Sequence, residues 1–284
     1  MKILITGAYG MLGSDLREIL KNHELINTGS KELDITNYNK VIEFILEKSP
    51  NIVINAAAYT AVDNCETNYE DAYKVNAIGP KNLAIACNKI GIPLIHFSTD
   101  YVFEGNKRTP LIEGDELGPK TVYGKTKLEG EKFILENIKK YFIIRTAWLY
   151  GIHGKNFVQT MLNLSKKNKE LKVVNDQIGS PTYSYDLAKA IFELLNSDKY
   201  GICHLTNKGE VSWYDFAKKI FELKNIDIKI NPVSSEEFKR PAPRPHYSVL
   251  CNQKWIDAGF KPMRNYEDAV KEYLALTFKA LLGY

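Results

Sequence analysis

The sequence predicts an α/β protein with a doubly wound parallel Rossmann sheet and a smaller C-terminal substrate domain. Short apolar runs of strand length alternate with stretches of helical apolar spacing, and a glycine-rich turn follows the first run at once. Parallel strands that are buried on both faces read as continuous apolar runs, as residues 52–58 (IVINAAA) do. The 284 residues suffice for one large domain and a smaller companion.

The first half of the chain supplies most of the predicted sheet. We expect strands near residues 3–5, 25–30, 52–58, 94–97 and 142–147. Parallel neighbours need long crossovers, and the intervening stretches carry apolar side chains at helical spacing. These helical positions are Leu16, Ile19 and Leu20, then Val41, Ile42, Ile45 and Leu46, then Leu83, Ile85 and Ala86.

The pattern loosens after residue 147. We expect residues 1–147 to form the dinucleotide-binding domain, with about 175–206 returning to it, and residues 148–284 to form mainly the discontinuous substrate-binding domain. A helix near 157–164 and a strand near 172–174 belong to the second domain, whereas a helix near 185–195 and a strand near 202–205 rejoin the main sheet. The proline-rich residues 240–245 must form an extended loop, because proline lacks an amide donor.

The composition indicates a cytoplasmic enzyme that binds neither nucleic acid nor membrane. The net charge of +4 is small, and no Lys/Arg stripe or membrane-spanning apolar run stands out. The four cysteines lie too far apart for a zinc site and are expected to be reduced core thiols. The apolar start leads directly into the glycine turn, without room for a signal sequence. A homodimer is compatible with these features.

The glycine turn Gly7-Ala-Tyr-Gly10-Met-Leu-Gly13 is predicted to bind the pyrophosphate of a dinucleotide. Gly7 and Gly10 let the backbone approach the phosphates, and Gly13 lets helix and strand pack closely. Met11 and Leu12 open the helix, whose first N–H groups are unpaired donors. The alternative is a plain strand-to-helix turn.

The coenzyme is predicted to be NADPH or NADH. An acid near the end of the second strand would favour NAD, whereas a basic residue would accommodate the phosphate of NADP. That strand ends at LINTGS, without an acid, and Lys31 follows. The pattern favours NADP, or the use of both coenzymes.

Tyr123 and Lys127 are the candidate catalytic pair. Residues four positions apart lie on one face of a helix, so the two side chains can act together. A tyrosine ionises near pH 10 unless a nearby cation stabilises its phenolate, and Lys127 would supply that cation. The alternative is an amphipathic helix start with a surface lysine.

The chain resembles the extended branch of the short-chain dehydrogenase/reductase family over nearly its whole length. The glycine turn has that family's GxxGxxG spacing, and further similar segments are NAAAYTAVD (55–63), STDYVF (98–103), YGKTKLEGE (123–131), RTAW (145–148) and DQIGSPT (176–182). The resemblance implies a catalytic hydroxyl at Thr99, favoured over Ser98, and a supporting role for Asn76. It implies coenzyme contacts at Asp34, Ile35, Ala56, Ala57, Ala58 and Thr60, in addition to the glycine turn, Tyr123 and Lys127. It also implies substrate contacts at Thr99, Asp100, Trp148 and Arg244, although Arg244 could equally form a loop salt bridge.

The activity implied by the resemblance is reduction of the C4 ketone of dTDP-4-dehydro-L-rhamnose to dTDP-L-rhamnose, with Tyr123 as general acid. The expected partner is therefore a dTDP-sugar. Magnesium is associated with the family, but no carboxylate cage is evident in the sequence, and no metal site is predicted.

Two alternatives stay open. One is another sugar-nucleotide epimerase or dehydratase of the family, although Tyr101 stands after Asp100 where dehydratases generally carry a glutamate. The other is a noncatalytic regulatory subunit of the methionine adenosyltransferase type, against which the retained Tyr123 and Lys127 argue.

Overall fold

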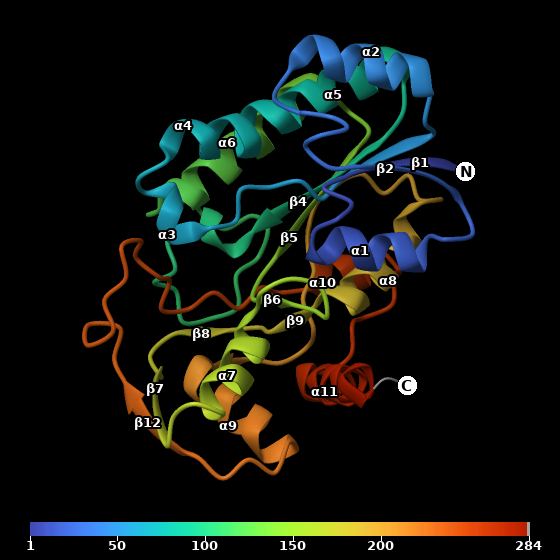
Figure 1. Ribbon diagram of the computed structural model, residues 1–284. Coiled ribbons are helices and arrows are strands. Elements are labelled where there is room, and N and C mark those ends of the chain that lie inside the picture. The colour runs from blue at the N-terminus through green and yellow to red at the C-terminus, as the bar shows by residue number, and fades with distance from the viewer. Residues whose placement is uncertain (283–284) are drawn as a thin grey trace.

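The computed structural model describes residues 1–282, and it contains a six-stranded parallel sheet (Figure 1). Its strands, in spatial order, are β10 (Gly201–His204), β5 (Tyr141–Thr146), β4 (Leu94–Thr99), β3 (Ile52–Asn55), β1 (Lys2–Thr6) and β2 (Glu24–Thr28). All neighbours pair in parallel. The chain order reverses between β1 and β3, and ligands of such sheets bind outside the carboxyl ends of the strands at this point. The predicted fold class is confirmed.

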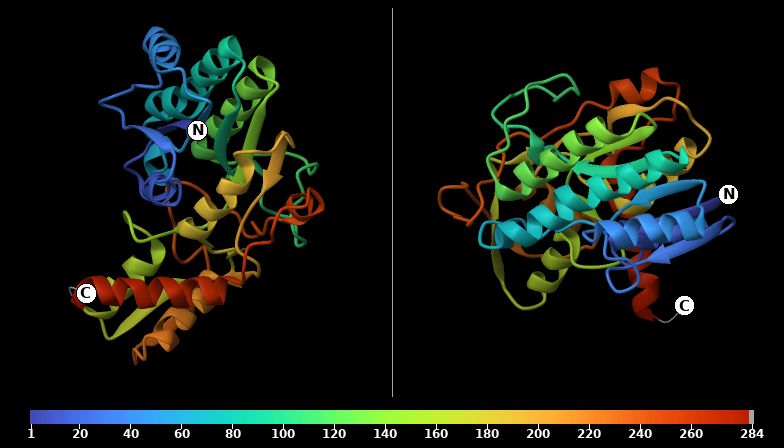
Figure 2. Two further views of the ribbon diagram at one scale, coloured as in Figure 1. Left: turned by 90° about the vertical axis from the view of Figure 1, so that its right-hand side faces the viewer. Right: turned by 90° about the horizontal axis from the view of Figure 1, so that it is seen from above.

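Helices cover both faces of the sheet, as a parallel sheet requires. On one face lie α1 (Met11–Ile19), α8 (Ser184–Leu194) and α10 (Gln253–Asp257), which pack on Ile3 and Ile5. On the other face lie α2 (Tyr38–Lys48), α5 (Gly79–Ile90) and α6 (Val122–Asn137), which enclose Leu4. Figure 2 shows α2, α5 and α6 side by side when the molecule is seen from above.

The second half of the chain adds a lobe with its own core, below the sheet in Figure 1. The parallel pair β7 (Glu170–Val174) and β12 (Lys229–Val233) forms its outer edge. Around it lie α7 (Phe157–Ser165), α9 (Trp213–Leu223) and α11 (Tyr266–Leu282). The aromatic rings of Tyr150, Tyr183, Phe216 and Tyr273 pack against one another at its centre.

Short elements connect the lobe to the sheet. The strand pairs are β6 (Leu149–Tyr150) with β9 (Thr182–Tyr183), and β8 (Ile178–Gly179) with β11 (Val211–Ser212). The remaining short helices are α3 (Val62–Cys65), α4 (Tyr69–Tyr73), the π-helix η1 (Lys74–Ile78) and the 3₁₀ turn η2 (Asp100–Val102).

The predicted elements agree with the structure, with two differences. The third strand ends at Asn55 instead of continuing to residue 58, because the Asn55 side chain accepts hydrogen bonds from the Ala57 amide and from Thr6, which turns the backbone out of the sheet. Leu46, expected on the buried face of α2, is 50% exposed. Residues 240–245 contain neither helix nor strand, as expected from their prolines.

All four cysteines are free, with Cys65 and Cys87 buried and Cys203 and Cys251 half-buried. In the described part of the chain, none of the helices has the length and apolar character needed to cross a membrane.

Candidate active site

The glycine turn between β1 and α1 leaves no room for side chains at two of its positions. Gly7 has φ +67°, and a Cβ there would lie 2.5 Å from the Ala57 nitrogen. A Cβ on Gly13 would lie 2.1 Å from the Gly7 carbonyl oxygen. Helix α1 begins at Met11 without a side-chain cap, so the amide groups of its first turn are available to a ligand.

A cleft of about 430 Å³ opens beside this turn, at the carboxyl ends of β4 and β5. Of the sequence-predicted site residues, the structure brings together in its lining Gly10, Met11, Leu12, Ala56, Ala58, Thr60, Thr99, Asp100, Tyr123, Lys127 and Trp148. Ser98 Oγ and Thr146 Oγ1 also lie here, buried and without a hydrogen-bond partner. Buried polar atoms of this kind need a partner, and a bound dinucleotide or sugar can supply it. The lining therefore fits a dinucleotide.

Other predicted residues lie behind or beside the cleft. Gly7 and Gly13 form the close contact beneath it, and the Ala57 amide is bound by Asn55. Asp34 is exposed and accepts hydrogen bonds from Thr36, whereas Ile35 is buried in the core against Gly79.

Arg244 forms an ion pair with Asp63, with Nη2 and Oδ1 2.9 Å apart. It lines two neighbouring cavities, and neither is the cleft of Tyr123. The structure therefore shows the loop salt bridge, which was one of the two interpretations of Arg244 from the sequence.

Helix α6 carries Tyr123 and Lys127 into the cleft. The helix starts at Val122, where the Thr121 hydroxyl caps it by accepting from the Gly124 amide at 2.9 Å. Lys127 is 2% exposed, and its Nζ donates to the Phe97 carbonyl oxygen at 2.6 Å. Burial lowers the pKa of Lys127 to about 8, and the charge of Glu131 opposes this shift.

The Tyr123 phenol is held in its protonated form. Burial raises the pKa of Tyr123 above its ordinary value, a hydrogen bond with Thr99 opposes the shift, and the charge of Asp100 adds to it. The sequence led us to expect that Lys127 would favour the phenolate. In the structure the Lys127 amine instead binds the Phe97 carbonyl, and burial dominates the titration of the phenol.

Thr99 and Asp100 form a buried pair at the end of β4. The Thr99 hydroxyl donates to Asp100 Oδ1 at 2.9 Å and accepts from the Tyr101 amide at 3.3 Å. Burial raises the pKa of Asp100 to about 6, and the hydrogen bond from Thr99 opposes the shift. The Tyr101 ring meets the Tyr123 ring edge to face, with centroids 5.5 Å apart.

Trp148 joins the cleft to the second lobe. Its backbone has φ +47°, uncommon for a residue with a side chain and typical of functional positions. Its ring stacks on Trp213 with the centroids 3.4 Å apart, and a Cβ on Gly179 would lie 2.4 Å from it. The packing therefore fixes the tryptophan in the lining of the cleft.

Asn76 supports the cleft from the π-helix η1, a helix type that often occurs at functional sites. Its side chain accepts from the Tyr59 amide at 2.8 Å and lies 3.2 Å from Thr126 Oγ1 on α6. It thus fixes the segment around Tyr59, whose neighbours Ala58 and Thr60 line the cleft.

No motif in the sequence pointed to His96 as a residue of the site. The residue is fully buried on β4, and its Nε2 lies 3.3 Å from Lys127 Nζ. The available signal was a polar side chain inside an apolar strand, three residues before Thr99.

Within residues 1–282 there is no group of three or more His, Cys, Asp or Glu side chains that could hold a metal ion, so magnesium is not supported.

The parallel sheet, with the glycine turn and the Tyr123–Lys127 pair in one cleft, defines a Rossmann-fold protein of the short-chain dehydrogenase/reductase type. The family described as "RmlD substrate binding domain" matches residues 1–278, and the chain belongs to this family.

Three similar proteins illustrate the relationship. The spore coat polysaccharide biosynthesis protein SpsK of Bacillus subtilis is 44% identical over 96% of each chain. A crystal structure of a dTDP-4-dehydrorhamnose reductase from Clostridium acetobutylicum is 52% identical, covers 98% of this chain and 99% of its own, and superposes with a TM-score of 0.95. A dTDP-4-dehydrorhamnose reductase from Bacillus anthracis, solved with NADP, is 42% identical, covers 96% and 98%, and has a TM-score of 0.94.

Proposed function

We propose that this chain is an NADPH-dependent reductase that converts the C4 ketone of dTDP-4-dehydro-L-rhamnose into the alcohol of dTDP-L-rhamnose. The observation that carries the proposal is that Tyr123 and Lys127 line the same cleft as the glycine turn. The relatives from Clostridium acetobutylicum and Bacillus anthracis are described as dTDP-4-dehydrorhamnose reductases, which supports the choice of substrate.

Tyr123 is the general acid. A tyrosine is protonated at neutral pH, and burial raises the pKa of Tyr123 further, so Tyr123 holds a proton where the substrate oxygen becomes an alkoxide. NADPH supplies the hydride to C4 when it is bound. The phenol proton passes to the oxygen of the former ketone, which becomes the alcohol, and a proton from solvent then restores the Tyr123 phenol.

The other cleft residues position the reactants. Lys127 holds the nicotinamide ribose, and Asp100 and Trp148 contact the sugar. The only proton of the Thr99 hydroxyl points to Asp100, so Thr99 must turn away from this carboxylate to stabilise the developing oxyanion. Arg244 reaches the diphosphate only if it releases Asp63.

The coenzyme preference is assigned to NADPH, with NADH as the alternative. The NADP complex of the Bacillus anthracis relative and the exposed Lys31 favour NADPH. One carboxylate favours NADH: Glu32 follows β2, and its Oε2 accepts from the Gly29 amide at 2.7 Å. Comparing kcat/KM for the two coenzymes measures the balance.

The test follows oxidation of NADPH with a dTDP-4-keto-6-deoxy sugar, with and without an epimerase that supplies the L-configured ketone. We expect turnover to require the epimerase. Tyr123→Phe should lower kcat by about 10²–10⁴-fold while coenzyme affinity is retained. The exposed Tyr69 gives the matched control, Tyr69→Phe, which should leave the rate unchanged. Full activity of Tyr123→Phe would remove the proposed acid.

The same assay separates the alternatives, because an epimerase or dehydratase uses its coenzyme without net consumption and a regulatory subunit gives no turnover.

The four free cysteines suit a reducing compartment, so we place the enzyme in the cytoplasm. A homodimer stays a prediction, which light scattering can test.

A further inference from the structure

A chain of buried polar side chains crosses the sheet beneath the cleft. It runs from Thr6 on β1 through Asn55 on β3 and His96 on β4 to Lys127 on α6. Thr6 Oγ1 donates to Asn55 Oδ1 at 2.7 Å, Asn55 Nδ2 lies 3.0 Å from His96 Nδ1, and His96 Nε2 lies 3.3 Å from Lys127 Nζ. Each residue is at most 2% exposed. The polar atoms must therefore satisfy one another.

The orientation of the Asn55 amide is fixed from outside this chain. The backbone amide of Ala57 donates to Asn55 Oδ1 at 3.2 Å. A backbone N–H can only donate, so the oxygen of Asn55 must stay on the side of Ala57 and Thr6. The NH₂ group of Asn55 consequently faces His96, and it can only donate.

This contact determines the tautomer of His96. Because Nδ1 receives a hydrogen bond from Asn55, it must carry a lone pair, and the neutral ring carries its proton on Nε2. Burial and the charge of Lys127 both lower the pKa of His96 well below its ordinary value, so the ring stays neutral. The Nε2–H group then points at Lys127 Nζ.

Lys127 meets two groups of opposite polarity. Its Nζ donates to the Phe97 carbonyl oxygen at 2.6 Å and lies within reach of His96 Nε2–H. An ammonium has three donors and no acceptor, so it would set donor against donor at the histidine. An uncharged amine has a lone pair, which can accept the proton of Nε2–H while the amine still donates to Phe97.

We propose that His96 is a positioning residue for Lys127, locked by Asn55 as the Nε2–H tautomer, and that it stabilises the uncharged form of the lysine by donating a hydrogen bond to it. This inference rests on the proposed function, because it concerns the same site. It makes the charge of Lys127, and with it the affinity for an anionic coenzyme, sensitive to pH near neutrality.

The other charged groups around Lys127 leave burial as the main cause of its lowered pKa. Burial lowers the pKa of Lys127 to about 8 against the opposing charge of Glu131. That carboxylate is itself neutralised by Arg145 on β5, at 2.7 Å. The titratable or charged groups near the lysine are His96, Tyr123, Glu131 and Arg145, with Asp100 at the end of β4.

The tautomer can be measured directly by NMR on protein labelled with ¹⁵N-histidine. Long-range ¹H–¹⁵N correlations distinguish the two tautomers, and His96→Gln assigns the signal of His96 among the five histidines. We expect His96 to be neutral and protonated on Nε2 throughout the pH range in which the protein is folded. An Nδ1–H tautomer or an imidazolium at neutral pH would overturn the proposal.

Two variants test the effect on Lys127. Asn55→Asp keeps the shape but replaces the donor by an acceptor, so His96 should move its proton to Nδ1 and accept from Lys127. His96→Gln keeps the polarity, since its amide oxygen can face Asn55 and its NH₂ group can face the lysine. The Cε signal of ¹³C-labelled Lys127, assigned by Lys127→Arg, should titrate well below the other lysines in the wild type and in His96→Gln. In Asn55→Asp it should titrate at least about one pH unit higher than in the wild type. It should also titrate higher than in the double variant Asn55→Asp/His96→Gln, which carries the same added carboxylate without the imidazole.

The coenzyme provides the functional readout. Affinity for NADPH should fall as pH rises through the titration of Lys127, and this fall should move to higher pH in Asn55→Asp but stay in place in His96→Gln. If the polar chain had a purely structural role, Asn55→Asp would change the affinity without moving the pH profile, and that result would contradict the proposal. Failure of the sugar assay would leave the tautomer and the lysine titration unaffected, so the two proposals fail separately.

Discussion

Asp100 shows how an individual residue of the site reduces the stability of the fold. The carboxyl group is 3% exposed, and burial raises its pKa from 3.8 to about 6. Since the folded state holds the proton more tightly than the unfolded state, the carboxyl stabilises the fold at low pH, and this contribution is lost as pH rises from about 4 to about 6. At neutral pH the fold carries a desolvated carboxylate, as functional sites often do.

We therefore expect Asp100→Asn to be more stable than the wild type above about pH 6, by up to about 3 kcal/mol for a shift of two units, and equally stable near about pH 4. Activity should fall, because the carboxylate contacts the sugar in the proposed function. Thermal unfolding at both pH values measures the effect. The exposed loop residue Asp198 offers the control Asp198→Asn, with no pH-dependent change. Loss of stability at neutral pH in Asp100→Asn would show that burial of the charge is not the main effect.

Some residues of the site could be predicted from their neighbours in the sequence, and others could not. Tyr123 and Lys127 could be predicted because helical spacing alone places them on one face. The glycines of the turn could be predicted from their position between an apolar strand and a helix. His96 could not, because its role depends on Asn55 and Ala57, which lie about forty residues away in sequence and meet it only in the folded sheet.

At the scale of elements, the contact between α1 and β1 depends on one missing methyl group. A Cβ on Gly13 would overlap the Gly7 carbonyl oxygen at 2.1 Å and approach the Ala8 backbone at 2.8 Å. Both neighbours are backbone, so they cannot move without displacing the turn. The amino end of α1 is therefore held where its amide groups face the cleft.

Gly13→Ala should lose most of its affinity for NADPH and destabilise the protein by about 1–3 kcal/mol through overpacking. Titration of NADPH fluorescence and thermal unfolding measure the two effects. Gly114 provides the matched control, since a Cβ there meets nothing within 4 Å, and Gly114→Ala should bind NADPH as the wild type does. Wild-type affinity in Gly13→Ala would mean that the helix end does not bind the coenzyme.

Elements were predictable where their own residues determine them. Most strands of the main sheet contain apolar runs, and the sequence predicted their positions within a few residues. The two-residue strands β6, β8, β9 and β11 carry no periodicity and exist only through partners about thirty residues away. The π-helix η1, which packs against α6, was not predicted either.

On the scale of the whole molecule, the sequence predicted the sheet better than the second lobe. The alternation of strands and helices restricts the sheet to few topologies, whereas the lobe is assembled from aromatic side chains in segments of little regularity, such as Tyr150, Phe216 and Tyr273. The division of the chain into two domains stays a prediction. The interactions that hold the lobe against the sheet join residues that are far apart in the sequence.

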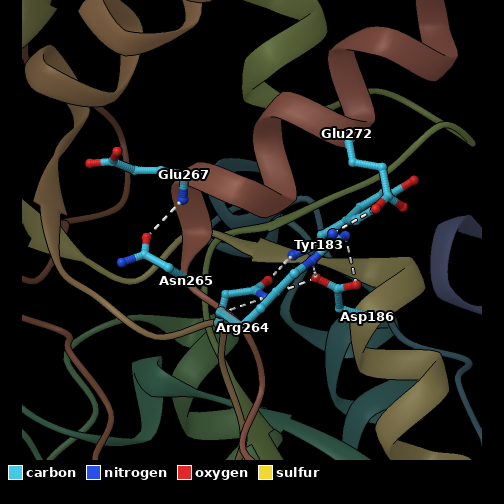
Figure 3. Close-up of polar contacts among 7 residues, drawn as sticks. Tyr183, Asp186, Arg264, Asn265, Glu267 and Glu272 are labelled. Carbon is cyan, nitrogen blue, oxygen red and sulfur yellow. Dashed lines mark hydrogen bonds and ion pairs between the residues drawn. The ribbon is translucent and has the colours of Figure 1, made fainter.

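Arg264 makes a polar contact of this kind, as Figure 3 shows. It precedes α11, and its guanidinium bridges Asp186 on α8 at 2.8 Å and Glu272 on α11 at 2.6 Å. Asp186 is 8% exposed and also accepts from Asn207 after β10. The network thus links a helix packed on the main sheet to the last helix of the lobe.

Arg264→Met should leave the Asp186 carboxylate without its cation and lower stability by about 1–3 kcal/mol, less than for a fully buried pair because Arg264 is 31% exposed. The loss should be local, with faster hydrogen exchange in α11 before any change in the strands of the main sheet. The exposed pair of Lys229 and Glu170 gives the control Lys229→Met, which should change neither quantity. If exchange instead becomes faster to the same extent in α11 and in the main sheet, the lobe and the sheet unfold as one cooperative unit. Loosening the Arg264 contact alone could then not move Trp148 relative to the rest of the cleft.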